Sequence, residues 1–148
     1  MKRFLLILLT CLICSFGSFA QTDNSANPVS LGLLLIDQPS VEKMITTCRY
    51  YNLLEEPSQE GYNVFRHPNG TVYQFKVDER NSQHFPIVKV TTKDSQKTLD
   101  NILTQSGYKK ESGVYVKGTK FEHRRTKCSI TGNAKKTLTF QKEYNSLE

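Results

Sequence analysis

Two stretches of the sequence decide the fold: SVEKMITTCRY at residues 40–50 and DSQKTLDNILTQSGY at residues 94–108. In both, apolar residues recur at positions i, i+3 and i+4, the spacing of one face of an α-helix. The first helix should run from its cap Ser40 to Tyr50, and the second should begin at Asp94 or Ser95 and stop at Gly107. The two stripes superpose at an offset of 58: Val41, Met44, Ile45, Cys48 and then Leu99, Ile102, Leu103, Ser106.

Three segments with strand character follow each helix. They are Tyr62–Arg66, Thr71–Val77 and Pro86–Thr92, then Val114–Lys117, Lys120–Thr131 and Lys136–Lys142. The last strands of the two sets match at an offset of 50. We therefore predict an α+β fold of two α-β-β-β repeats that form one antiparallel sheet of about six strands, with two helices on one face. The alternative is a single irregular α+β domain whose halves agree by chance.

The connecting segments carry weaker signals. Leu31–Ile36 is short and apolar, and we interpret it as a buried extended piece. Residues 55–61 are polar and should break the first helix, and residues 78–85 should form a polar loop that leaves Pro86 as the first residue of its strand. Asn69-Gly70 predicts a hairpin turn; with Thr71 it also fits a glycosylation acceptor, but the turn explains it.

The N-terminus has the layout of a secretory signal peptide. Met1-Lys2-Arg3 is basic, Phe4–Cys14 is almost wholly apolar, and Ser18-Phe19-Ala20 offers small residues for cleavage. We expect residues 1–20 to be removed, residues 21–29 to be a flexible leader, and residues 30–148 to form one domain of repeats 30–93 and 94–148. The mature protein should be periplasmic or secreted, without a membrane span; an uncleaved N-terminal anchor is the alternative.

Cleavage would leave two cysteines, Cys48 and Cys128. A lone pair in an exported chain favours a disulfide. Closing a loop of 80 residues would stabilise the fold by roughly 4–5 kcal/mol in the chain-entropy account. The alternative is a catalytic thiol paired with one of the histidines, His67, His84 or His123.

Alternation along the strands separates two faces of the sheet. Tyr73, Phe75, Val88, Leu138 and Phe140 should meet the helices, and so should Cys128 if it bonds Cys48. The opposite face then carries aromatic, aliphatic and basic residues. From these we select as candidate binding residues Lys89, Tyr115, Phe121, His123, Arg125 and Lys127.

The charge of the chain is uneven. Residues 21–94 carry 7 basic and 9 acidic side chains, whereas residues 95–148 carry 11 basic and 5 acidic ones. This favours an acidic protein surface as partner, although an ordinary solvated sheet face would also carry Lys and Arg. Export and the modest net charge argue against nucleic acid.

Motifs for catalysis are absent from the sequence. It contains no phosphate loop, no dinucleotide fingerprint, no His-Glu-x-x-His and no Gly-x-Ser-x-Gly, and the histidines lack metal-ligand spacing. We therefore predict a non-enzymatic protein without catalytic residues, metal or cofactor.

The signal junction Ser18-Phe19-Ala20-Gln21, the helix stripes and Gly107-Tyr108 resemble small exported proteins of Bacteroidetes type, and the layout is similar to the β-lactamase inhibitor protein fold. This resemblance implies protein binding through an open sheet face, such as that of an inhibitor or an immunity protein. A small-molecule or lipid-binding periplasmic carrier and a small hydrolase are the alternatives.

Overall fold

The computed structural model describes residues 27–80, 83–118 and 125–143. The expected signal peptide lies outside the described residues, and so do Phe121 and His123. In chain order the elements are α2 (Pro28–Ile36), α3 (Val41–Tyr50), β1 (Leu54–Gln59), β2 (Tyr62–Arg66), β3 (Val72–Arg80), β4 (Gln83–Thr92), α4 (Gln96–Gln105), β5 (Lys109–Glu111), β6 (Val114–Lys117), β7 (Arg125–Thr131) and β8 (Lys136–Glu143).

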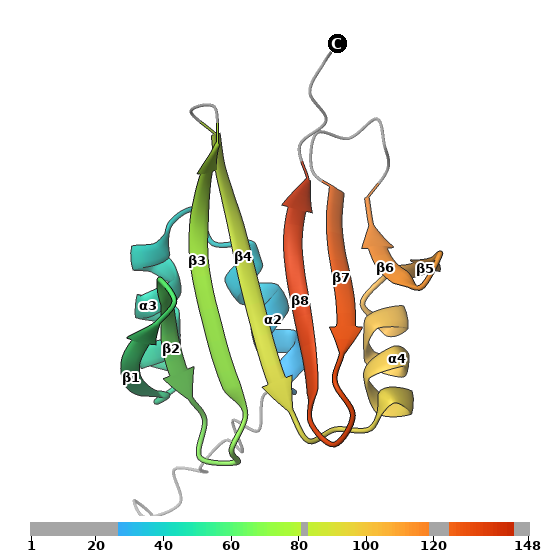
Figure 1. Cartoon of the computed structure of the whole chain (residues 1–148), viewed down its shortest axis with the longest axis horizontal. Coiled ribbons are helices and arrows are strands. Elements are labelled where there is room, and N and C mark those ends of the chain that lie inside the picture. The colour runs from blue at the N-terminus through green and yellow to red at the C-terminus, as the bar shows by residue number, and fades with distance from the viewer. Residues whose placement is uncertain (1–26, 81–82, 119–124, 144–148) are drawn as a thin grey trace, which may run out of the picture.

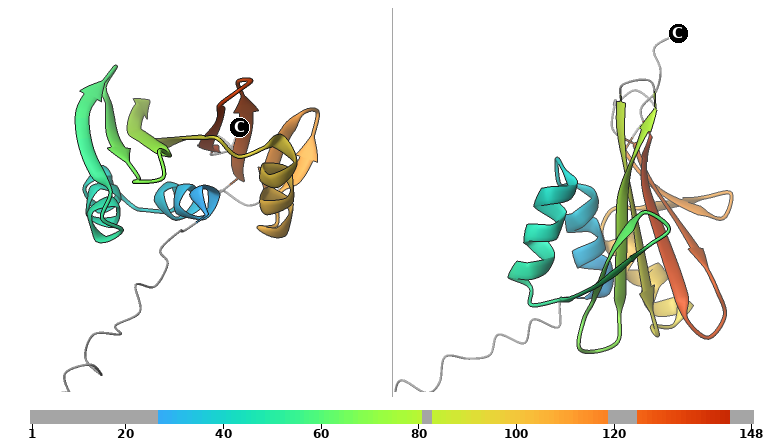
Figure 2. Two further views of the ribbon diagram at one scale, coloured as in Figure 1. Left: turned by 90° about the horizontal axis from the view of Figure 1, so that it is seen from below. Right: turned by 60° about the vertical axis from the view of Figure 1, so that its left-hand side comes forward.

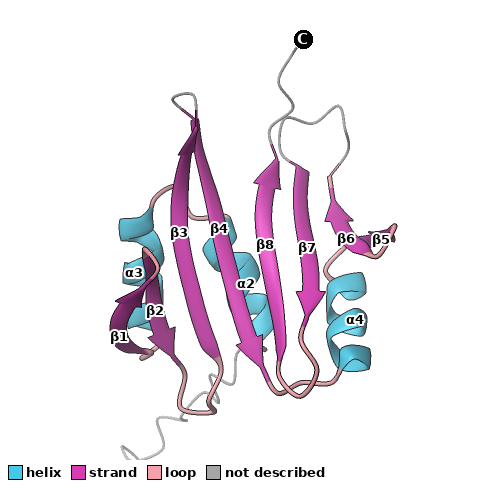
Figure 3. Ribbon diagram, in the orientation of Figure 1, coloured by secondary structure: helices cyan, strands magenta, loops and turns pink. Residues whose placement is uncertain are grey.

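The strands form one antiparallel sheet in the order β1-β2-β3-β4-β8-β7-β6-β5 (Figure 1). The three helices of the described chain lie in a row on one face of this sheet, with α2 between α3 and α4 (Figure 2). The α+β class and the single antiparallel sheet are therefore as predicted. In each half one helix, α3 or α4, is followed by four strands and not three, and β4 pairs with β8 where the halves meet (Figure 3).

The two strands absent from the prediction are β1 and β5, at the two edges of the sheet. They lack apolar alternation because nearly every residue in them is exposed. β1 contains Pro57 and a register irregularity between Glu56 and Gln59, and β5 has only three residues. Both features limit pairing of an edge with another chain.

The segment expected to be extended at Leu31–Ile36 is instead the helix α2, and this prediction was wrong. The Asn27 side chain accepts a hydrogen bond from the Val29 N–H at 3.0 Å, and Pro28 occupies the first turn. Both are signals for a helix start. A short apolar run does not distinguish a strand from a buried helix, and α2 is apolar even on its exposed side, where Leu34 lies, so no clear polar face revealed its period.

Both predicted helices are confirmed, with Ser40 and Ser95 as their N-caps. They also end alike. Asn52 and Gly107 adopt positive φ, and the next residue, Leu53 or Tyr108, donates its N–H to a carbonyl five residues earlier.

Caps, ends and buried positions of the two helices correspond at an offset of 55 residues, not 58. Met44 corresponds to Leu99 and Cys48 to Leu103, and all four side chains are fully buried. A stripe with neighbours three and four residues apart nearly superposes on itself when shifted by three. The apolar stripes alone therefore do not determine the offset between the two helices. The N-caps Ser40 and Ser95, 55 residues apart, determine it.

The hairpin between β2 and β3 is confirmed, with a loop of residues 67–71. His67 and Thr71 close it through a 2.8 Å backbone hydrogen bond, and Asn69 Oδ1 accepts from the Thr71 N–H at 2.9 Å. The predicted loop at residues 78–85 is shorter than expected, because β3 continues to Arg80 and β4 begins at Gln83. Pro86 lies inside β4 opposite Val77, just before the part of β4 that pairs with β8, so its missing N–H breaks no bond to that strand.

The core lies between the helices and the sheet, and α2 covers its centre against β4 and β8. Gly32 permits this close approach. A Cβ atom at Gly32 would lie 2.7 Å from Val90 Cγ2 and 3.0 Å from a ring carbon of Phe140. No described helix is both long and apolar enough to cross a membrane.

Replacing Gly32 with Ala should lower the free energy of unfolding by about 1–3 kcal/mol, because α2 or the stiff Val90 side chain must move. Chemical denaturation of the purified protein measures this change. The matched control is Ser30→Ala, at an exposed position of the same helix. Stability equal to or above that of wild type would mean that a Cβ atom fits at Gly32 without strain, and it would contradict the close approach of α2 to Val90 and Phe140.

Candidate binding surface

The sheet face opposite the helices is uncovered by any described element, and we refer to it as the open face (Figure 2). Cross-strand register places its residues in rows. One row contains Lys76, Ile87, Gln141, Lys127 and Val116, and the next contains Val64, Gln74, Lys89, Thr139 and Ser129. The predicted face assignment of β3, β4, β7 and β8 is thereby confirmed.

Four large apolar side chains belong to the open face and lie outside the main core cluster: Tyr62, Val64, Ile87 and Val116. Each is at most 9% exposed although no described helix or strand layer covers them. Lys76 and Lys89 extend over the Tyr62 ring, and the aliphatic stems of such long charged side chains can cover apolar surface. The open face thus has an apolar floor below a charged outer layer.

Tyr62 is the centre of this arrangement. Lys76 Nζ lies 4.4 Å from the centroid of its ring, and Lys89 Nζ lies 4.3 Å from the same point. Ammonium groups at such distances are attracted by the negative face of an aromatic ring. Neither lysine forms an ion pair with a described carboxylate.

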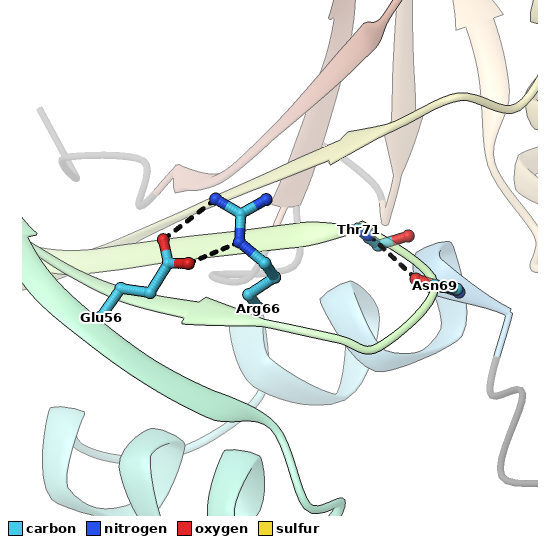
Figure 4. Close-up of polar contacts among 4 residues, drawn as sticks. All are labelled: Glu56, Arg66, Asn69 and Thr71. Atoms are coloured by element: carbon cyan, nitrogen blue, oxygen red, sulfur yellow. Dashed lines mark hydrogen bonds and ion pairs between the residues drawn. The ribbon is translucent and has the colours of Figure 1, made fainter.

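Arg66 on β2 does have a carboxylate partner. Its Nε and Nη2 donate to the two oxygens of Glu56 on β1, at 2.5 and 3.1 Å (Figure 4). This paired hydrogen bonding lowers the pKa of Glu56 below its ordinary value and raises that of Arg66. Arg66 is therefore paired within the first repeat, whereas Lys76 and Lys89 have no ion-pair partner among the described carboxylates.

The basic strand of the second repeat is also neutralised internally. Arg125 pairs with Glu111 at 2.5 Å, and Lys127 pairs with Glu143. Both residues lie on the open face, as predicted, but their charge is compensated within the chain. Among these described cations of the open face, Lys76 on β3 and Lys89 on β4 are the ones that belong to no ion pair.

Tyr115 was predicted to lie on the open face, and this was wrong. It pairs with Cys128 across β6 and β7, so the two side chains share the helix face, and Tyr115 is only 4% exposed. Its hydroxyl donates a hydrogen bond to Asp100 of α4 at 2.5 Å. A four-residue strand has two possible faces, and only its register with β7 determines which one is buried.

Lys76 belongs to the face that alternation leaves opposite the helices, but neither Lys76 nor Tyr62 was among the candidate residues. The hairpin at Asn69-Gly70 was the available signal. It sets β2 against β3, and the observed register brings Tyr62 beside Lys76. The candidates Phe121 and His123 remain predictions, because they lie outside the described residues.

The predicted disulfide is not formed: Cys48 and Cys128 are both free and buried. Cys48 lies on α3, which packs against β3, whereas Cys128 lies on β7, three strands farther along the sheet. Neighbouring strands are about 4.8 Å apart, so the two elements are too far apart for a bond. The unpredicted helix α2 occupies the centre of the helical layer between them (Figure 2).

Burial also makes these thiols poor nucleophiles. It raises the pKa of Cys48 to about 12, with a smaller contribution from the Glu55 charge, and it raises the pKa of Cys128 to about 12. Such thiols are protonated near neutral pH, whereas nucleophilic attack requires the thiolate. The arrangement does not favour the alternative of a catalytic cysteine at either position.

Within residues 27–80, 83–118 and 125–143, no group of three or more His, Cys, Asp or Glu side chains could hold a metal ion. Comparison with known proteins adds no relative: no family model, curated protein or solved structure matches the chain. The open face must therefore be interpreted from its own geometry and charge.

Tyr115→Phe should reduce the free energy of unfolding by about 1 kcal/mol at pH 7, because Asp100 loses a hydrogen-bond donor. Burial acts to raise the pKa of Asp100, but hydrogen bonds from Tyr115 and Gln96 and the charge of Lys110 outweigh it and lower the pKa. The interaction therefore stabilises the fold above the unfolded-state pKa of about 3.9 and is lost as pH falls through the lower folded-state pKa.

Urea denaturation at several pH values from 7 downward measures this difference. The gap between wild type and Tyr115→Phe should be full at pH 7 and should shrink below about pH 4. Tyr50→Phe is the control, since Tyr50 is 77% exposed and should show no gap. A gap that stays constant down to acid pH would mean that Tyr115 acts through packing alone.

Cys48 and Cys128 should resist iodoacetamide at pH 8 in the native protein and react fully in guanidinium without any reductant. Peptide mass mapping distinguishes them from Cys11 and Cys14. A linked Cys48–Cys128 peptide in the unreduced protein would contradict the separation of α3 from β7.

Proposed function

We propose that the protein is an exported, non-enzymatic binding module, such as an inhibitor or an immunity protein, that contacts an acidic protein surface through its open face. The observation that supports this most directly is the apolar floor of Tyr62, Val64, Ile87 and Val116 beneath a layer of charged side chains on an uncovered face. Stable protein interfaces have a desolvated centre with aromatic anchors and a polar rim.

The charged side chains of the open face can cover the apolar floor in the free protein and rearrange when a partner binds. Lysine and arginine stems can stay in contact with the floor while their charged ends turn toward a partner. Lys76 and Lys89 supply positive charge without a competing carboxylate from the described chain, which favours an acidic partner and speeds its association.

The edges of the sheet are less suitable than its face. Pro57 and the register irregularity interrupt β1, and β5 offers only three residues. A partner strand could form few backbone hydrogen bonds at either edge. We therefore assign the contact to side chains of the open face.

A photo-crosslinking amino acid at Gln141 should yield a discrete protein adduct in cells that produce the chain, because this exposed residue lies on the open face between Ile87 and Lys127. The same amino acid at Thr46, an exposed position of α3, is the matched control. Denaturing gels after illumination compare the two positions. Adducts from Thr46 but not from Gln141, or from neither, would contradict binding through the open face.

A further inference from the structure

We infer that Tyr62, Lys76 and Lys89 form a carboxylate-binding subsite that receives an aspartate or glutamate side chain of the partner protein. This inference rests on the proposed function and specifies which part of the open face anchors the partner. The three residues come from the adjacent strands β2, β3 and β4.

The geometry brings two positive charges together. Because both ammonium nitrogens lie within 4.4 Å of the same ring centroid, they are no more than about 9 Å apart. At this separation two like charges repel, the more so above a floor that excludes water. One aromatic ring stabilises each cation in part, but it supplies no net negative charge.

The neighbours of the two lysines show why this pair differs from the other cations of the face. Lys76 faces Ile87 across β3 and β4, and Lys89 lies between Gln74 and Thr139, so neither has a carboxylate directly opposite. Arg66, Arg125 and Lys127 each have a glutamate partner instead. A carboxylate of the partner would form with Lys76 and Lys89 the kind of ion pair that glutamates of the chain form with Arg66, Arg125 and Lys127.

A protein carboxylate fits this place better than a polyanion. The acidic residues Glu56, Glu111 and Glu143 also lie along the open face and would repel an extended chain of phosphates. A single Asp or Glu in an otherwise mixed surface presents two oxygens, each of which can accept a hydrogen bond from one of the flexible lysine side chains. The Gln74 amide beside Lys89 is a further donor on the same face.

The subsite is tested with the purified full chain and fluorescein-labelled decaglutamate, by fluorescence anisotropy at low salt. Lys76→Met with Lys89→Met keeps much of the aliphatic stems and removes both charges. Lys43→Met with Lys97→Met makes the same change of net charge at exposed positions on α3 and α4. We expect at least tenfold weaker binding for the first double variant and less than threefold for the second.

Equal losses of affinity in the two double variants would overturn the subsite, because they would reflect net charge alone. Unchanged affinity in both double variants would also overturn it. A labelled single-stranded oligonucleotide is the second probe; if it binds more tightly than decaglutamate and loses affinity only with Lys76 and Lys89, phosphate replaces carboxylate as the ligand. Circular dichroism and thermal melting confirm that each variant is folded. If the Gln141 crosslink forms but the affinity for decaglutamate does not depend on Lys76 and Lys89, the proposed function stands and the subsite fails.

Discussion

The pairing of β4 with β8, covered by α2, is the constraint on which the rest of the structure depends. These two strands join the halves of the sheet from Ile87 opposite Gln141 to Thr92 opposite Lys136. Gly32 lets α2 lie directly against Val90 and Phe140 at this junction. Since the centre of the helical layer is then filled, α3 and α4 pack toward the two flanks, where each covers its own half (Figure 2).

That arrangement has two consequences for chemistry. It separates Cys48 from Cys128, so the fold is stabilised by packing of two buried thiols and not by a covalent link. It also gathers all the described helices on one face, which leaves the other face to be shielded by its own long side chains. Ion pairs then form mainly where an edge strand or a strand end supplies glutamate, as Glu56 and Glu111 do. Within the described residues, the central lysines Lys76 and Lys89 belong to no ion pair and lie against the Tyr62 ring.

Several features could be predicted because their causes are local. Ser40 and Ser95 cap helices through their own hydroxyl groups, and Asn69-Gly70 turns the chain by its own backbone preferences. The buried face of β3, β4 and β8 follows from alternation. Cys128 lies on the predicted face, although the disulfide expected to hold it there does not form. The alternation along β7 reflects the burial of Cys128 against the helices.

The sequence by itself determined the two capped helices, the hairpin, the α+β class and the separation of Lys76 and Lys89 from the core, because propensity, capping and alternation act within a few residues. Only the tertiary structure decided that residues 28–36 form a helix, that Tyr115 faces α4, and that Arg125 and Lys127 are neutralised. Each of these depends on contacts between segments that lie far apart in the chain or, for α2, on an apolar composition that leaves no clear polar face to reveal the helix. The convergence of two lysines on Tyr62 is of the same kind, since strand register alone brings them together.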